Sequence, residues 1–253
     1  MKPPPLEAIL RRDRIVVAAA LGAMALLCWA YLAWLAAAPH SMAAMAPDLG
    51  HWSAADFLMM VTMWWVMMVG MMIPAAAPMI LIYARVARQA RERGTPFAAA
   101  AWFALGYLLA WLGFALAATA LQWSLERALL LSPMTARVAP GLGGALLIAA
   151  GLYQWTPLKD ACLAYCQSPM RFIQRYGFRG ERGAAVRLGL RHGAFCIGCC
   201  WALMILLFVG GVMNLLWIAA IAALVLAEKL VATHIVPRTG GIAMIAAGVA
   251  LLV

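Results

Sequence analysis

Apolar residues form long, nearly uninterrupted runs along this chain, and the polar residues gather between the runs. A helix needs about 20 apolar residues to cross the roughly 30 Å hydrocarbon core of a bilayer. Windows of about this length predict spanning helices at 16–38, 57–83, 97–123, 138–157, 194–212, 215–233 and 239–253. The last window is short, so the pattern predicts an all-α polytopic transmembrane helix bundle with six to seven spans. Residues 1–253 then form a single integral membrane domain.

The composition narrows the class of protein further. Hydrophobic residues make up 67% of the chain, charged residues only 11%, and the mean hydropathy is +0.92. Soluble domains are about half apolar and about a quarter charged, so too few polar residues remain here to cover a soluble core. This excludes a soluble enzyme, a disordered chain and a disulfide-stapled secreted module. The continuous apolar runs also argue against a transmembrane β-barrel, whose strands alternate.

The net charge of +10 comes from basic residues in alternate connections: before the first window, after the second, and between the fourth and fifth. Cytoplasmic loops are enriched in Lys and Arg. The pattern therefore predicts a cytoplasmic N-terminal tail at 1–14 and a basic cytoplasmic segment at 158–192, with an amphipathic interfacial helix around 168–191. These charges are assigned to topology and to the lipid bilayer, and no nucleic acid partner is expected.

The strongest candidate for chemistry lies at the cytoplasmic mouth of the fifth window. Residues four apart share one face of a helix, so His192, Cys196 and Cys200 align, and Cys199 lies beside them. Imidazole and thiolate bind soft or borderline metals such as Cu(I) and Zn(II). Cysteine is also a common buried core residue, so packing is the competing interpretation.

A second cysteine pair follows the fourth window. Cys162 and Cys166 are also four residues apart, and the predicted topology places them on the same cytoplasmic side as the first cluster. Two cysteine pairs at one membrane face could complete a metal site. They could equally be two redox-active dithiols, since a stable structural disulfide is disfavoured in the reducing cytosol.

Methionines dominate the second window. Met67 and Met71 lie on one helical stripe, and Met68 and Met72 lie on a neighbouring one. Methionine is a flexible core filler, so such a stripe often serves packing. Its thioether is also a soft ligand, and the functional interpretation is a path that passes Cu(I) along the helix.

Two ionisable residues, Glu228 and Lys229, fall inside the sixth window, where charge is costly and usually functional. A tight connection near 210–214 predicts an antiparallel hairpin, which places Glu228 at the depth of Cys199. Glu228 is then a candidate ligand, a proton acceptor, or the partner of Lys229. The competing interpretation is a pair that snorkels to the interface.

An outer loop at 39–56 combines histidine and methionine, which suits copper on the oxidising side of a membrane. The residues are His40, Met42, Met45 and His51. In so short a loop this composition carries little weight.

Taken together, these motifs resemble a known family. The resemblance rests on Trp64, Trp65, Met68 and Gly70 through Pro74, on Tyr153, Pro157, Lys159, Cys162 and Cys166, and on Cys196, Cys199, Cys200, Trp201, Glu228 and Lys229. They are similar to an uncharacterised bacterial family of predicted metal-binding integral membrane proteins, a domain of unknown function. The resemblance covers roughly residues 57–230. It implies a multi-pass protein of the bacterial inner membrane, and metal binding as the family's own prediction.

The leading hypothesis is a membrane protein of metal transport or homeostasis that binds a soft transition metal ion, with copper favoured, near the cytoplasmic side. The candidate metal residues are Cys162, Cys166, His192, Cys196, Cys199, Cys200, Glu228, Met67, Met68, Met71 and Met72. A soluble metal carrier is the expected protein partner, and no oligomeric state is predicted. Transport, sensing and storage all fit the pattern. The alternatives are a membrane thiol–disulfide oxidoreductase that uses the Cys pairs, and a partner-binding membrane protein whose Cys and Met residues only fill the core.

Overall fold

The fold is known from a computed structural model that describes residues 6–37, 52–95, 97–132, 137–178 and 180–253. The described chain is a bundle of α-helices with one small hairpin, in which β1 (Leu131–Ser132) pairs antiparallel with β2 (Arg137–Val138) and Leu131 lies opposite Val138. The all-α prediction is therefore confirmed. The outer-loop residues His40, Met42, Met45 and His51 lie outside the described residues.

Five helices in the described ranges are long and apolar enough to cross a membrane. They are α1 (Leu6–Ala37), α3 (Ala54–Glu92), α4 (Ala100–Arg127), α8 (Arg182–Ile205) with its continuation α9 (Leu207–Gly210), and α11 (Ile235–Leu252). Two predicted windows hold shorter helices. The window at 138–157 holds α5 (Pro140–Tyr153) with 14 residues, and that at 215–233 holds α10 (Leu215–Leu230) with 16. Both are shorter than the about 20 residues that a perpendicular span needs.

Helix α1 already begins at Leu6, within the predicted cytoplasmic tail at 1–14, whose side of the membrane stays a prediction. One boundary from the sequence is wrong in detail. The single helix expected at 168–191 is two elements: α7 (Pro169–Tyr176) ends at Gly177, and α8 begins at Arg182. Gly177 has a φ of 65°, a backbone conformation that glycine adopts without steric cost. The last third of the basic segment therefore belongs to the long helix α8.

Side-chain caps fix where the short helices begin. Thr156 accepts a hydrogen bond from the backbone N–H of Lys159 and starts α6 (Pro157–Gln167), and Ser168 does the same for α7. In both helices proline occupies the first turn, where no backbone donor is needed. Asn214 caps α10 in the same way. These caps set the register of the residues that α6 and α10 bring to the bundle interior.

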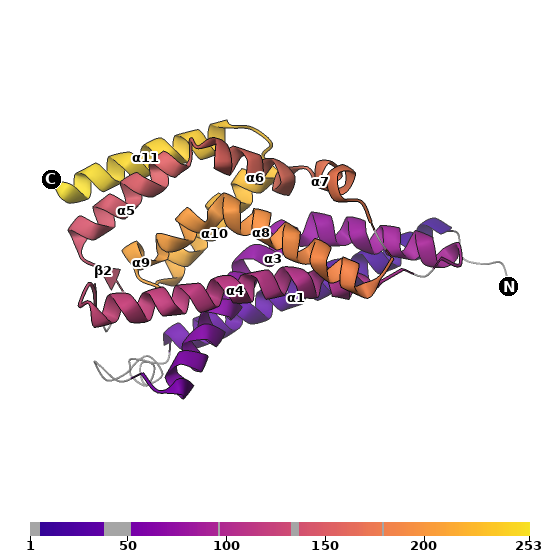
Figure 1. Cartoon of the computed structure of the whole chain (residues 1–253), viewed down its shortest axis with the longest axis horizontal. Coiled ribbons are helices and arrows are strands. Elements are labelled where there is room, and N and C mark those ends of the chain that lie inside the picture. Colours follow the sequence, from indigo (N-terminus) through magenta and orange to yellow (C-terminus); the bar gives the residue numbers. More distant parts are fainter. Residues whose placement is uncertain (1–5, 38–51, 96, 133–136, 179) are drawn as a thin grey trace.

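Glycines let helices α4 and α8 approach closely. A Cβ atom added to Gly106 of α4 would collide with the backbone oxygen of Val186, and one added to Gly189 of α8 would collide with that of Phe103. The helices α5 and α11 pack in the same way, with Gly144 of α5 against Gly248 of α11. Figure 1 shows α5 and α11 side by side along one edge of the bundle. Small residues at such crossings allow two backbones to touch.

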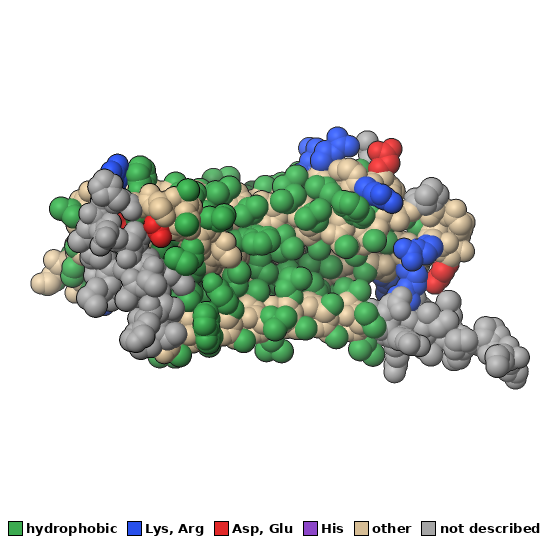
Figure 2. All heavy atoms as spheres, turned by 90° about the horizontal axis from the view of Figure 1, so that it is seen from below, with side chains coloured by type: hydrophobic (Ala, Val, Ile, Leu, Met, Phe, Trp, Pro, Cys, Tyr) green, Lys and Arg blue, Asp and Glu red, His purple; other side chains and the backbone are tan. Residues whose placement is uncertain are grey.

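The surface is apolar around the middle of the molecule. Figure 2 shows hydrophobic side chains over the central part of one face and most of the Lys and Arg side chains at one end. Several large apolar side chains are more than half exposed, among them Leu26, Leu27, Trp34, Leu216 and Ile242. The buried core lies instead along α3, α4 and α8, where Trp64, Tyr107 and Trp111 are fully buried.

Candidate metal centre

Helix α8 carries three buried cysteines on one side. Cys196, Cys199 and Cys200 are at most 2% exposed. The thiols of Cys199 and Cys200 both donate to the backbone oxygen of Cys196, at 3.0 and 2.9 Å. These bonds follow from the spacing, because residues three and four apart meet along a helix. The sequence-predicted alignment of these thiols is thus present.

Helix α6 brings the second cysteine pair to the same place. The Sγ atom of Cys166 lies 3.9 Å from that of Cys199. A metal ion bonds to sulfur at about 2.3 Å, so two sulfurs that share one ion lie within about 4.6 Å of each other. The separation of Cys166 and Cys199 meets this condition.

Cys162 lies one turn before Cys166, against the backbone of α8. A Cβ atom added to Gly198 would come within 2.8 Å of its sulfur, so the glycine makes room for this thiol. Burial, and to a smaller extent the nearby Cys199, raises the pKa of Cys162 above its ordinary value. Cys162 therefore flanks the other thiols and, like Cys166, is half-buried.

Helix α3 contributes one of its methionines to this cluster. The Sδ atom of Met72 lies 3.7 Å from the Nζ atom of Lys229, which itself contacts Cys196. Met67, Met68 and Met71 are just as buried, at 0 to 2% exposure, and belong to the hydrophobic core along α3. Of the four predicted methionines, Met72 is the one that shares a partner with the cysteines. We call Met72, Cys166, Cys196, Cys199 and Cys200 the sulfur cluster.

Lys229 places its ammonium group at the sulfur cluster. Its Nζ donates to the Sγ of Cys196 at 2.9 Å, and the side chain is 6% exposed. It does not snorkel, in contrast to one of the two interpretations of the sequence. The contact also shows that the end of α10 lies beside the cysteines of α8, as the hairpin argument predicted.

Glu228 does not pair with Lys229, the partner considered from the sequence. Its Oε2 atom lies 2.7 Å from the Nζ of Lys159 on α6, and both side chains are at most 1% exposed. The partner of Glu228 is therefore Lys159 and not its neighbour Lys229. The other carboxylate oxygen, Oε1, and both amide atoms of Gln154 are buried with no hydrogen-bond partner among the described residues. Glu228 thus belongs to a polar group next to the sulfur cluster.

Tyr107 of α4 contacts the sulfur cluster and was not found from the sequence. Its hydroxyl lies 3.1 Å from the Sγ of Cys196 and 3.2 Å from the backbone oxygen of Met72. The close crossing of α4 and α8 at Gly106 and Gly189 brings it there. A single tyrosine in an apolar span has no spacing signal that could have indicated this contact.

His192 is buried but surrounded by aromatic rings. Its imidazole centroid lies 5.8 Å from Phe103, 5.8 Å from Tyr107 and 5.1 Å from Phe172. Its Nδ1 atom has no hydrogen-bond partner in the described part of the chain. The structure thus places the imidazole in an aromatic cage one turn from Cys196.

The side chains of the described residues do not form a preformed metal site, of either soft or hard donors. Within the described residues, no group of three or more His, Cys, Asp or Glu side chains is placed to hold a metal ion. All six cysteines are free. What converges is thiol and thioether sulfur, buried except at the half-buried Cys166, and this is the donor type that selects soft ions such as Cu(I).

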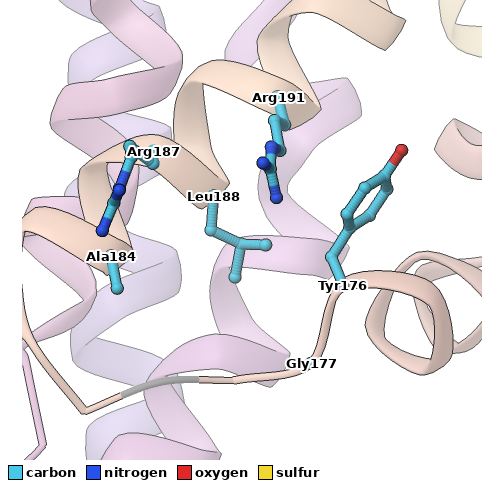
Figure 3. A pocket seen from close by; sticks show the side chains of 6 residues that line it. All are labelled: Tyr176, Gly177, Ala184, Arg187, Leu188 and Arg191. Carbon is cyan, nitrogen blue, oxygen red and sulfur yellow. The ribbon is translucent and has the colours of Figure 1, made fainter.

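A separate cavity of about 160 Å³ lies near the basic end of the molecule (Figure 3). Its lining consists of Tyr176, Gly177, Ala184, Arg187, Leu188 and Arg191. The guanidinium group of Arg191 lies 5.2 Å from the centroid of the Tyr176 ring. The lining contains neither sulfur nor carboxylate, so this cavity does not suit a metal cation.

Comparison with known proteins adds one finding to this geometry. Neither a curated protein nor a solved structure matches the chain. A family model described as PpoB2, copper chaperone, matches residues 61–251, which include all the residues of the sulfur cluster. The match agrees with the metal-related part of the resemblance noted in the sequence. Since it spans well over half of the sequence, the chain belongs to the PpoB2 copper chaperone family.

Proposed function

We propose that this protein is an integral membrane copper-handling protein that binds Cu(I) at the sulfur cluster. The observation that carries the proposal is the convergence of sulfur from three helices: the buried Met72 from α3, the half-buried Cys166 from α6, and the buried cysteines of α8. Thiolate and thioether sulfur select Cu(I) over harder ions. The membership in a copper chaperone family supports the same metal.

The ligands are expected to come from Cys166, Cys196 and Cys199, with Met72 as a thioether ligand. Cys166 and Cys199 are already close enough to share one ion. Cys162 and Cys200 flank these sulfurs and serve as exchange positions. Glu228 and His192 remain candidates for proton acceptance near the site, while Met67, Met68 and Met71 continue the line of thioethers along α3.

The apolar surface supports insertion in a membrane. Five helices have the length and composition of spans, and exposed leucines such as Leu26 and Leu216 would be costly in water. On the face that Figure 2 shows, most of the visible Lys and Arg side chains lie at one end. By the positive-inside rule, that end and the N-terminus face the cytoplasm of a bacterial inner membrane. The sulfur cluster is then in reach of a soluble copper carrier on the cytoplasmic side.

Metal content tests the copper proposal. The wild-type protein, purified in detergent from copper-supplemented cells, is compared with a triple variant, Cys196→Ser, Cys199→Ser and Cys200→Ser. We expect near-stoichiometric copper in the wild type and little in the triple variant. The control is Cys28→Ser, since Cys28 lies in α1 against Gly70 and not among the cysteines of α6 and α8. Equal, substoichiometric copper in wild type and triple variant would overturn the proposal.

Topology is tested separately. Reporter enzymes that are active on only one side of the inner membrane are fused after Arg93 and after Gly211. We expect a cytoplasmic signal at Arg93 and a periplasmic signal at Gly211. Recovery of the full-length protein in the soluble fraction would contradict membrane insertion while leaving the copper experiment valid.

A further inference from the structure

Lys229 is a buried cation whose partners are unusual. Its ammonium group contacts the Sγ of Cys196 and faces the Sδ of Met72. No carboxylate forms an ion pair with it within the described ranges, because the neighbouring Glu228 is bound to Lys159 instead. A buried ammonium group is costly unless something compensates its charge. Here the compensating atoms are the sulfurs proposed as copper ligands.

The ammonium group of Lys229 therefore lies where a metal ion bound by the same sulfur atoms would lie. Nζ lies 2.9 Å from one sulfur and 3.7 Å from another, which come from α8 and α3 respectively. An ion between these helices would need the same space and the same electron-rich sulfur atoms. Both cannot occupy the place at once.

We propose that Lys229 holds the cation position of the sulfur cluster in the metal-free protein, and that the incoming metal ion replaces it. This inference rests on the proposed function and deepens it. Lys229 is then a built-in competitor that lowers the affinity of the sulfur cluster for the metal ion.

The replacement of the Lys229 ammonium group by a metal ion also favours one charge for the bound ion. Each thiol that binds the ion as a thiolate releases its proton to solvent. For the same number of released protons, a monovalent ion that replaces the ammonium group leaves the charge next to the sulfur atoms unchanged. A divalent ion would add one uncompensated charge in an interior where charges are poorly screened. The cargo class is therefore a soft monovalent cation, Cu(I) or its analogue Ag(I), rather than Zn(II).

The displaced Lys229 side chain can move to the C-terminal end of α10. Lys229 lies in the last turn of α10, and the next two residues, Leu230 and Val231, are 61% and 44% exposed. Lysine has a flexible four-carbon stem, and the C-terminus of a helix stabilises a cation. The ammonium group can therefore leave the sulfur cluster for the helix end without being neutralised.

The first experiment removes the competitor. Cu(I) affinity of the detergent-purified protein is measured by competition with a chromogenic Cu(I) chelator. We expect Lys229→Leu to bind Cu(I) at least about tenfold more tightly than wild type. In the variant no ammonium group has to leave the sulfur cluster before the ion binds, so the binding-competent state is fully populated. Weaker or unchanged binding by Lys229→Leu would overturn the inference. The control, Arg175→Leu, removes a positive charge from exposed α7 and should bind like wild type.

Further measurements keep the inference testable if Lys229→Leu does not fold. Lys229→Arg keeps a competing charge and should bind Cu(I) no more tightly than wild type; tighter binding would contradict the inference. In wild type, Ag(I) should displace Cu(I) while a large excess of Zn(II) should not. X-ray absorption of copper-loaded wild type should show sulfur neighbours without nitrogen, since a nitrogen ligand would mean that Lys229 stays and coordinates the ion.

These outcomes separate the two proposals. Wild-type protein that binds no Cu(I) overturns both the proposed function and the role of Lys229. Wild-type protein that binds Cu(I), together with a Lys229→Leu variant that binds it no more tightly, overturns the role of Lys229 alone.

Discussion

Two buried lysines lie close together in this protein and have different partners. Lys159 on α6 is matched by the carboxylate of Glu228 at 2.7 Å, whereas Lys229 on α10 contacts sulfur. Both are almost completely buried. The first pair is compensated within the protein itself, so it has the character of a structural link between α6 and α10. The ammonium group of Lys229 instead contacts a sulfur atom that is a proposed metal ligand. The charge of Lys159 is therefore structural, whereas that of Lys229 can be exchanged for a metal ion.

The largest effect is expected from Lys159→Leu. It leaves Glu228 buried without a partner, and breaking a buried ion pair in this way costs about 3–5 kcal/mol. Unfolding of the purified variant in detergent measures this loss. The equivalent change at Lys229, which strands no carboxylate, should cost clearly less. A similar loss of stability in both variants would remove the contrast between the two lysines.

The double variant Lys159→Leu with Glu228→Leu should recover most of that loss. Replacing both members of a buried ion pair by apolar residues is often neutral or stabilising. The same unfolding measurement gives the coupling between the two residues. If the double variant is as unstable as Lys159→Leu, the pair is not the origin of the loss.

A change on the sulfur side should affect metal binding more than stability. Met72→Leu conserves volume and should cost less than about 1.5 kcal/mol of folding stability. Because the variant removes a thioether ligand, we expect Cu(I) affinity to fall by about tenfold, or about 1.4 kcal/mol. Met79→Leu, also buried on α3 but outside the proposed ligands and thioether line, is the matched control. Equal Cu(I) affinities for both variants would exclude Met72 as a ligand.

The smallest effect is expected from Tyr107→Phe. The variant loses the hydroxyl contacts with Cys196 and the backbone of Met72, which are worth about 1 kcal/mol in stability. Thermal unfolding in detergent measures the change. A loss several times larger would mean that Tyr107 organises the cluster and does more than complete its hydrogen bonds.

The sequence predicts those parts of the site that depend on spacing within one helix. The alignment of Cys196, Cys199 and Cys200 follows from helical periodicity, and the approach of α6 follows from the shared side of the two cysteine pairs. The contacts of Tyr107 and the pairing of Lys159 with Glu228 depend on how separate helices cross. Those crossings are set by close backbone contacts, as at Gly106, and small residues at four-residue spacing indicate a packing face of a helix without indicating which helix packs there.

The fold shows the same division. Apolar windows locate the helices, but their lengths depend on local events such as the cap at Thr156 and the positive φ of Gly177. The helix expected at 168–191 is divided for this reason. The number of helices long enough to span is five within the described ranges, because α5 and α10 end early.

The length of α3 has a mechanical consequence. With 39 residues it is about 58 Å long, nearly twice the thickness of a hydrocarbon core of roughly 30 Å. In the proposed orientation the C-terminal part of α3 extends beyond the lipid. There the Tyr83 ring stacks on Phe103, is tilted against Phe97, and meets Phe178 edge-on. These ring contacts link α3 to the beginnings of α4 and α8. A carrier that docks from the cytoplasm would therefore contact packed helix ends rather than a loop.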